Sequence, residues 1–484
     1  MTIKLKTISV PGLPQSLAAL AFLLLSGFVL PAQTREVGKL FAQNCAACHG
    51  ADLKGGQTDS LLDDHWKHGN GDDATLFRII RDGDEPNGMP PMKGDISDAE
   101  IRALVVFIRE KATQAKAAQT VFAKPIEDQV VKSSEHSFRL KTVAEGFSTP
   151  WSVAWLPDGR MLVAELPGTL RFVENGRLNP TPVAGTPRAR ASGQGGLMVV
   201  APHPDYARNG WLYLAYSEAG TNAETKDGGM TAIVRGRLKD NRWTDEQTIW
   251  RAPLWSFRSG GVHFGCRLAF DGAGHLFFTH GERGQMNDAQ DITRPNGKVH
   301  RVFDDGRIPP DNPFVGSSNA VASIWSYGHR NPQGLDINPV TGEVWATEHG
   351  PRGGDELNFI QKGHNYGWPI ITYGMNYNGT PITALTAREG LEQPVTYWTP
   401  SIAVCAARFY RGDQFPRWKN QLFVTALAQE ELRRINIEGH RVVGQEVIFK
   451  GIGRVRDVAT GPDGLLYVVL NKPDKIVRLE PVKE

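Results

Sequence analysis

Net charge is almost absent from this chain. Its 54 lysines and arginines are balanced by 52 aspartates and glutamates, which leaves +2 at neutral pH over 484 residues. No basic run is dense enough to override that balance, so the composition gives no support for a nucleic-acid-binding function. The 22% of charged and 40% of hydrophobic residues are ordinary for a soluble protein that buries a sizeable core. A chain of this length is expected to form two domains, one of them large.

Cysteine is also scarce, with four residues in total. Two of them stand in the segment Cys45-Ala46-Ala47-Cys48-His49. A redox or zinc site is the alternative interpretation, but a zinc site needs a second pair of cysteines or histidines, and none follows nearby. The spacing with its trailing histidine is typical of covalent haem attachment, in which Cys45 and Cys48 form thioethers and His49 ligates the iron. The sequence therefore predicts haem c and an electron carrier.

The first 33 residues have the pattern of a secretory signal peptide. Lys4 and Lys6 precede an apolar stretch from Leu17 to Leu30, which is followed by Pro31-Ala32-Gln33. A retained membrane anchor is the alternative, and only then would the protein be attached to a membrane. Both interpretations place the rest of the chain outside the cytoplasm, in the periplasm, where c-type cytochromes mature. We therefore expect an exported protein.

Residues 34–112 are predicted to form a small all-α haem domain. Val37, Leu40 and Phe41 share one helical face before the haem cysteines, and Ser97 to Glu100 form a capping box ahead of a final helix. Between these helices lies Gly88-Met89-Pro90-Pro91-Met92, where either methionine is a candidate for the second axial ligand. The segment resembles the class I cytochrome c family, whose ligand sits in a Gly-Met-Pro loop, and this favours Met89 over Met92. Residues 113–136 are expected to be a linker.

One pattern recurs from about residue 137 to residue 484: an apolar strand, a turn rich in Pro, Asp, Asn and Gly, and a second apolar strand. Six copies are found, at 152–163, 199–216, 268–279, 335–347, 415–427 and 458–470, and the fifth is degraded. Because such hairpins cannot bury both faces alone, we expect the copies to share a core as six blades of an all-β propeller. A β-sandwich with insertions is the alternative, but it would not explain the repeated turn.

Several loops between these copies carry polar side chains that a plain turn does not require. Three of these loops combine histidine or arginine with glycine or an extended backbone, at 259–267, 328–334 and 454–457. A fourth loop, 350–356, combines exposed carbonyls with two acidic residues. Local hydrogen bonding is the alternative for each segment. Taken together, arginines from different blades predict a pocket for an anionic ligand, and 350–356 is a candidate hard-cation site.

Residues 145–480 resemble the soluble PQQ-dependent aldose sugar (glucose/sorbosone) dehydrogenases, which are six-bladed propellers that bind pyrroloquinoline quinone (PQQ) and calcium. The resemblance is carried at family spacing by segments 193–197, 263–270, 328–334, 348–368 and 454–457. It implies that His263 is the general base that takes the proton of the anomeric hydroxyl while a hydride passes to PQQ. It also implies the remaining site residues. These are Gln194, Arg330, Asn331, Tyr377, Arg454 and Arg456 for PQQ, Gly350 and Pro351 for the catalytic calcium, and Glu356 and Tyr366 for a second calcium.

Three positions depart from the family pattern. Many members have a lysine where this chain has Ala428, and Cys266 and Cys405 stand in segments that family members usually place near the quinone. Because the two cysteines share that location and an oxidising compartment, the resemblance suggests that they pair as a disulfide. The departures put substrate choice and cofactor affinity in question more than the fold.

The sequence therefore predicts a fused enzyme in which a sugar reduces PQQ in the propeller and electrons pass singly to haem c. A downstream respiratory acceptor would be its partner. Two rival functions stay open. In one, the propeller oxidises a non-sugar alcohol or acts as a hydrolase, although the arginines argue against a hydrolase. In the other, a propeller that has lost PQQ binds a ligand or a partner.

Overall fold

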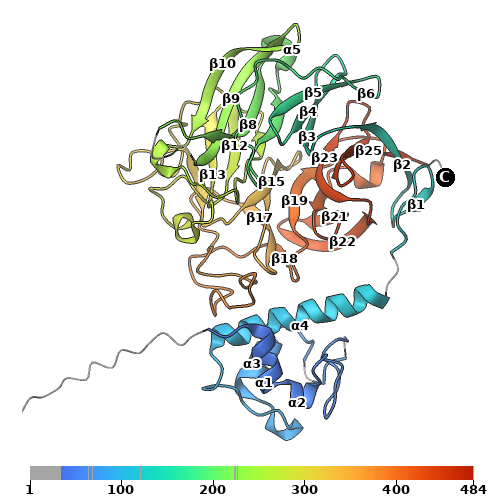
Figure 1. The fold of residues 1–484 in the computed structure, drawn as a ribbon, viewed down its shortest axis with the longest axis vertical. Helices are drawn as coiled ribbons and strands as arrows, with labels where there is room; N and C mark the ends of the chain where they lie inside the picture. The colour runs from blue at the N-terminus through green and yellow to red at the C-terminus, as the bar shows by residue number, and fades with distance from the viewer. Residues whose placement is uncertain are drawn as a thin grey trace, which may run out of the picture. The chain divides into compact units, whose positions relative to one another are not determined.

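The computed structural model describes residues 34–63, 65–67, 69–119, 122–222, 225 and 227–482. The expected signal peptide, residues 1–33, lies outside this range. The described part contains a small helical domain at the N-terminal end of the chain and a large all-β domain, as the sequence predicts (Figure 1).

The helical domain is built from α1 (Val37–Asn44), α2 (Ala46–His49), α3 (Asp73–Asp82), the 3₁₀ turn η1 (Glu85–Asn87) and α4 (Asp98–Gln119). The capping box at the start of α4 is confirmed, since the backbone N–H of Ser97 donates to Glu100 Oε2 over 3.0 Å and Ser97 Oγ accepts from the Glu100 N–H over 3.4 Å. Helix α4 continues to Gln119, so the first residues of the expected linker are helical.

The core of this domain forms where α1 and α4 meet. Val37, Leu40 and Phe41 are buried on one face of α1, as the helical spacing predicts. The rings of Phe41 and Phe107 lie 5.6 Å apart between their centroids, and Phe107 belongs to α4. This contact fixes the helix that leads into Cys45 and Cys48 against the last helix of the domain.

The large domain is made of six antiparallel sheets, which confirms the six-bladed propeller (Figure 1). Five sheets have four strands each, and each takes four strands in chain order. They are β3 (Pro150–Trp155), β4 (Met161–Glu165), β5 (Thr169–Glu174), β6 (Arg177–Leu178); β7 (Leu197–Pro202), β8 (Leu212–Ala219), β9 (Gly229–Lys239), β10 (Arg242–Arg251); β11 (Leu268–Phe270), β12 (His275–His280), β13 (Lys298–Phe303), β14 (Ile324–Tyr327); β15 (Pro332–Ile337), β16 (Val344–Glu348), β17 (Asp355–Ile360), β18 (Thr396–Trp398); β19 (Val404–Phe409), β20 (Leu422–Ala426), β21 (Glu431–Glu438) and β22 (Arg441–Lys450).

The sixth sheet closes the ring by joining the two ends of the domain. It contains β1 (Val130–Lys132) and β2 (Ser137–Glu145) from the start of the domain with β23 (Arg454–Thr460), β24 (Leu466–Asn471) and β25 (Lys475–Pro481) from its end. Strands β2 and β25 pair antiparallel from Phe138↔Pro481 to Glu145↔Lys475. Closure of this kind leaves the ring without an open end.

Five of the six expected repeats coincide with the first two strands of a blade. The expectation for the fifth, 415–427, is wrong in its first half, because β19 begins earlier, at Val404, and only β20 falls within the expected range. The segment between the two strands carries a 3₁₀ turn with the buried Trp418, which gives it a strand-like apolar pattern without a strand.

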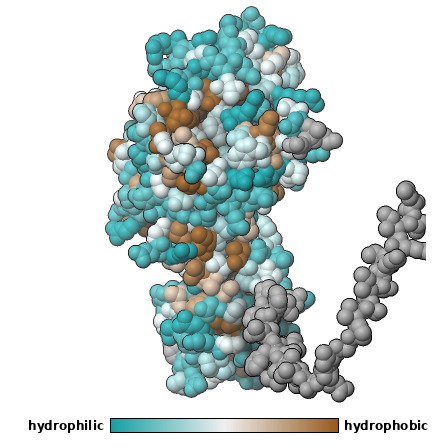
Figure 2. Space-filling view, turned by 90° about the vertical axis from the view of Figure 1, so that its left-hand side faces the viewer, coloured by the Kyte–Doolittle hydropathy of each residue, from teal (hydrophilic) through white to brown (hydrophobic). Residues whose placement is uncertain are grey.

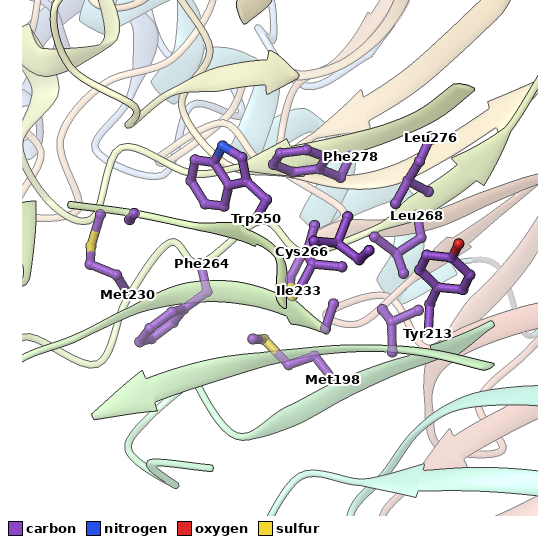
Figure 3. Close-up of a cluster of buried hydrophobic side chains, with 14 of the residues drawn as sticks. Met198, Tyr213, Met230, Ile233, Trp250, Phe264, Cys266, Leu268, Leu276 and Phe278 are labelled. Atoms are coloured by element: carbon purple, nitrogen blue, oxygen red, sulfur yellow. The ribbon is translucent and has the colours of Figure 1, made fainter. Parts of the chain in front are cut away.

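Neighbouring blades are held together by apolar side chains that alternate along the strands. One such cluster joins Met198 and Tyr213 of the β7–β10 sheet to Leu268 and Phe278 of the β11–β14 sheet (Figure 3). All four side chains are at most 3% exposed. The stacked hairpins therefore share a core, as the repeat requires.

A buried ion pair crosses the inner ends of several blades. Arg267 Nη1 donates to Asp457 Oδ1 over 3.0 Å, and the two side chains are 0% and 2% exposed. The Arg267 Nε donates to the carbonyl of Gln333, and its guanidinium lies 4.7 Å from the ring centre of Trp151. This arginine therefore joins the third, fourth and sixth sheets to β3.

We expect Asp457→Ala to destabilise the propeller by about 3–5 kcal/mol, because it leaves the Arg267 charge buried without its partner. Chemical unfolding followed by tryptophan fluorescence measures the change. Asp205→Ala is the matched control, since its ion pair with Arg208 is exposed, and the unfolding midpoint should stay unchanged. Equal midpoints for the two variants would contradict the expectation.

On the face drawn in Figure 2, hydrophilic residues predominate and hydrophobic ones form small patches among them. Within the described residues, no helix combines the length and apolarity needed to cross a membrane.

Candidate functional site

The predicted site residues stand where the chain enters the blades. In five sheets the first strand in chain order is an edge strand, and β23 is an edge strand of the sixth, so the segments that precede β7, β11, β15 and β23 are expected to meet at one end of the central channel of a propeller. Gln194 precedes β7, His263 precedes β11, Arg330 and Asn331 directly precede β15, and Arg454 begins β23. The hydrogen bonds described below confirm that these segments converge.

His263 is held from two sides. Its backbone N–H donates to Gln194 Oε1 over 2.8 Å, and its Nδ1 is hydrogen-bonded to Glu282 Oε1. Its backbone lies in the left-handed region, with φ 54°, which marks a residue held in place by its surroundings. The side chain is 12% exposed. With the Nδ1 proton donated to Glu282, Nε2 carries the free lone pair, which is the arrangement that a general base requires.

Burial lowers the pKa of His263 below 6.5, and the hydrogen bond that its Nδ1 donates to Glu282 opposes that shift. The imidazole is therefore neutral at neutral pH. Glu282 is not among the residues that the sequence predicts for the site. Leu268 pairs with Phe278, and this antiparallel register continued past the strand ends would place Arg283, the neighbour of Glu282, opposite His263, so the register indicates the segment but not the residue.

Arg330 and Asn331 face the same region. The backbone N–H of Arg330 donates to Glu348 Oε2 over 2.7 Å, and its Nη1 donates to the carbonyls of His349 (3.0 Å) and Gly350 (2.8 Å). Asn331 Oδ1 accepts from the Gly265 N–H over 3.0 Å. The Nδ2 of Asn331 is buried and has no hydrogen-bond partner within the described structure. A buried donor of this kind fits a carbonyl or carboxylate oxygen of a bound ligand.

Arg456 lies within a polar cluster at the start of the fifth and sixth sheets. Its Nη1 contacts Gln333 Oε1 (3.3 Å) and Cys405 Sγ (3.5 Å), and its Nε donates to Asn471. Burial and the positive charge of Arg456 lower the pKa of Arg454. Two guanidinium groups this close to each other favour an anionic ligand, since its charge would relieve their repulsion.

Tyr377 and Gln194 lie at the outer side of the site. The Tyr377 side chain is 72% exposed, and the Arg330 guanidinium lies 5.9 Å from its ring centre. Gln194 is exposed, and its side chain is fixed by His263. Both residues therefore lie close to other predicted site residues. From these exposed positions, either side chain could contact a ligand that enters the site from solvent.

The loop between β16 and β17 carries the predicted calcium residues Gly350 and Pro351. Asp355 Oδ1 accepts from the Gly350 N–H over 2.9 Å, and burial raises the pKa of Asp355 to about 6. A side chain at Gly350 would lie 2.3 Å from the Gly353 carbonyl oxygen, so the tight fold of the loop requires glycine there. The Gly350 carbonyl oxygen accepts from Arg330. No His, Cys, Asp and Glu cluster of metal-binding kind occurs in the described ranges, and a calcium bound by carbonyls at 350–351 stays a prediction.

The second predicted calcium pair, Glu356 and Tyr366, stays a prediction. Glu356 lies beside Glu348, and Asn358 Nδ2 donates to both carboxylates. Burial, followed by the charge of Glu348, raises the pKa of Glu356 well above its usual value. The Tyr366 hydroxyl donates to the Phe359 carbonyl. A cation between the two carboxylates would relieve their repulsion, whereas the Tyr366 hydroxyl is already engaged.

Cys266 and Cys405 do not form the expected disulfide, because both thiols are free in the structure. Cys266 lies in the apolar cluster between two blades, where burial raises its pKa (Figure 3). Cys405 is buried at the start of β19, and its Sγ lies 3.3 Å from Gln333 Oε1. The pairing hypothesis is thus wrong for this structure.

The haem-attachment segment begins at Cys45, directly after the last residue of α1, and includes all of α2. His49 Nδ1 lies 3.0 Å from Thr58 Oγ1, which leaves Nε2 available as a metal ligand. Cys45 packs against the core of the helical domain, as does Met92. Met89 is half-buried, and its backbone pairs with Asp84. The residues present fit a covalently held haem, and the choice between Met89 and Met92 stays a prediction.

Comparison with known proteins gives matches for both domains. The family model for glucose/sorbosone dehydrogenase matches residues 147–478, and that for subunit III of cbb3-type cytochrome c oxidase matches residues 32–108. The aldose sugar dehydrogenase YliI of Escherichia coli is 43% identical over 339 residues, which cover 69% of this chain and 90% of the relative.

Two solved structures extend the comparison. The soluble aldose sugar dehydrogenase of E. coli in its apo form has 40% identity and a TM-score of 0.67, over 71% of this chain and 100% of that one. The PQQ-bound aldose sugar dehydrogenase of Streptomyces coelicolor has 28% identity and a TM-score of 0.58, over 71% of this chain and 98% of that one.

Proposed function

The chain belongs to the glucose/sorbosone dehydrogenase family and carries an N-terminal cytochrome c domain, and on that premise we propose that it oxidises the anomeric carbon of an aldose sugar to the lactone. PQQ would be the first electron acceptor and the chain's own haem c the second. The protein would be exported to the periplasm and would deliver its electrons to a respiratory acceptor.

The observation that carries this proposal is the placement of a neutral, carboxylate-held histidine beside unpartnered donors and arginines. His263 Nε2 is free to accept the proton of the anomeric hydroxyl while Glu282 holds the ring. Asn331 Nδ2 and the guanidinium groups of Arg454 and Arg456 supply donors and positive charge for a quinone with three carboxylates. These residues would hold PQQ, which when bound would supply a carbonyl carbon as the hydride acceptor.

Calcium belongs to the same proposal. The carbonyl oxygens of Gly350 and Pro351 would hold it at the edge of the pocket, where it would act as a Lewis acid. For Gly350 this would require its carbonyl to exchange the Arg330 contact for the ion or to serve both. A second ion is proposed beside Glu356, where a cation would offset the repulsion between the Glu356 and Glu348 carboxylates.

The test is sugar-dependent reduction of the haem. Purified protein is oxidised, loaded with PQQ and calcium, and mixed with aldoses while the haem absorption bands are recorded. We expect reduction that requires both PQQ and sugar and that is prevented when the chelator EDTA is present during loading. No haem reduction by any sugar or alcohol despite bound PQQ would overturn the proposal. Reduction by non-sugar alcohols alone would change the substrate class.

The pH dependence gives a separate prediction. The base must be neutral, and the pKa of His263 lies below 6.5, so kcat/KM should rise with pH through a midpoint below 6.5 and be level at neutral pH. Glu282→Gln replaces the carboxylate, whose charge and charge-assisted hydrogen bond raise this pKa, by a neutral amide, and it should move the midpoint to lower pH. The rate is measured with a dye as the electron acceptor.

The matched control is Glu392→Gln, since Glu392 forms a similar pair with His364 at a more exposed position. This variant should keep the wild-type midpoint. A midpoint that moves to higher pH in Glu282→Gln would contradict the assignment of His263 as the base.

A further inference from the structure

Helix α4 of the cytochrome domain is buried on all sides over its middle part. The six successive residues from Ala103 to Ile108 are each at most 8% exposed. A helix that packs on one side only would leave some of six successive residues in water, since they cover more than a full turn. One side packs on its own domain through Phe107 and Phe41. The other must therefore face a second partner.

That partner is the propeller segment that contains Met375. Its side chain is 0% exposed and belongs to the same apolar cluster as Leu104 and Val105 of α4. The backbone of Met375 pairs in both directions with Arg352, over 3.0 Å each way. An apolar residue inserted from one domain into the core of the other indicates a built interface rather than a loose encounter.

Charged and polar contacts surround this apolar centre. Arg352 Nε lies 2.9 and 3.0 Å from the two carboxylate oxygens of Glu110, and its Nη2 lies 2.8 Å from Oε2. The side chains of Glu110 and Arg352 are 9% and 29% exposed. Nearby, the Tyr397 hydroxyl donates to Asp73 over 3.0 Å, and the Val37 N–H donates to the Gly379 carbonyl over 2.9 Å. The contact is complementary in charge and largely shielded from water.

The loop that provides Arg352 also borders the candidate quinone pocket. Arg352 stands two residues after Gly350, whose carbonyl accepts from Arg330 over 2.8 Å. The same short loop, 350–354, thus contacts the pocket through Gly350 and the cytochrome domain through Arg352. A fused domain on a flexible tether would not need such a contact.

We propose that the propeller surface formed by Arg352, Met375, Gly379 and Tyr397 is the docking site of the cytochrome domain, and that electrons pass from the quinone site to the haem in this docked state. The inference rests on the proposed function. Oxidation of the anomeric CH–OH to the lactone releases two electrons and two protons. Both protons would leave to solvent, one of them by way of His263. The haem would accept the electrons one at a time, and a one-electron oxidant such as ferricyanide would reoxidise it between the two transfers.

The experiment breaks the ion pair from the cytochrome side. Full-length Glu110→Lys, with haem, PQQ and calcium, places two cations together at the interface. Sugar-driven haem reduction, followed by stopped-flow absorbance, should slow by about tenfold or more, as expected when a docked state is replaced by a tethered search. Sugar oxidation with a diffusible dye should stay within about twofold of wild type, because Glu110 lies outside the pocket.

Two further variants serve as controls. Asp98→Lys makes the same charge change at an exposed position of α4 and should leave the haem reduction rate unchanged. The double variant Glu110→Lys, Arg352→Glu restores opposite charges and should recover most of the rate. Small-angle scattering reports docking independently of activity, and the radius of gyration should increase in Glu110→Lys alone.

The outcomes separate the two proposals. Haem reduction at the wild-type rate in Glu110→Lys, with an unchanged radius of gyration, would overturn the docking proposal while dye activity upholds the enzyme assignment. Absence of dye activity in the wild-type protein would overturn the proposed function, and scattering would still decide whether the domains dock at this surface.

Discussion

Replacing His263 by glutamine is expected to lower kcat for sugar oxidation by about 10²–10⁴-fold, the contribution that general-base catalysis typically makes. Glutamine can still form a hydrogen bond near Glu282. It lacks the basic imidazole nitrogen, His263 Nε2, that would accept the proton of the anomeric hydroxyl. The rate is measured with a dye acceptor, so that the result does not depend on the haem. Binding of PQQ should be retained, since the donors and arginines assigned to it are untouched.

The chain offers a close control for this substitution. His203 has a side chain that is 11% exposed and pairs with Asp304 over 3.1 Å, but it lies outside the site. His203→Gln should therefore keep kcat near the wild-type value. A kcat within about threefold of wild type in His263→Gln would remove this histidine from the catalytic role.

Removing both haem cysteines, Cys45→Ala with Cys48→Ala, is expected to abolish covalent haem attachment and with it all sugar-driven change in the haem bands. Each thioether bond to haem forms from one cysteine thiol, so the double variant can form none. The remaining ligand, His49, does not hold haem covalently. Denaturing electrophoresis with haem staining measures attachment. Sugar oxidation with the dye should continue, because the pocket residues belong to the propeller.

Cys266→Ala is the control for loss of a thiol. Cys266 lies in the core between two blades, far in sequence from the attachment segment, so the variant should keep its haem stain. Haem staining of the double variant of Cys45 and Cys48 would contradict the assignment of these cysteines to haem attachment. Loss of its dye activity would contradict the assignment of sugar oxidation to the propeller.

Much of the fold could be predicted because the repeating unit is local. A hairpin with alternating apolar residues and a Pro-Asp-Gly turn, as at 152–163, is encoded within about a dozen residues. The fifth repeat was misplaced because a buried 3₁₀ turn around Trp418 has the same apolar density as a strand. The end of α4 was also set too early, because its last residues, up to Gln119, carry helix-forming residues without an apolar stripe.

The candidate site was predicted where residues stand inside recognisable segments, as His263, Arg330 and Arg456 do. Glu282 and Gln333 were not singled out, because their roles depend on which atoms they meet in the folded chain. Glu282 meets His263 within one blade, and Gln333 meets Arg456 of another blade. The suggested disulfide failed for the same reason. Nearness of Cys266 and Cys405 to one pocket does not fix the direction of either side chain, and Cys266 points into an apolar cluster.

The sequence by itself determined the haem-type motif, the positions of five of the six repeats and the types of residue that meet at the channel, because spacing along the chain and turn chemistry are local properties. Only the tertiary structure decided that Glu282 holds His263, that both propeller cysteines are free, and that Arg352 reaches Glu110. The first contact depends on how the chain leaves strands β11 and β12, and the contact of Arg352 with Glu110 joins segments 242 residues apart. Packing selects such contacts, and turn chemistry and residue spacing do not encode them.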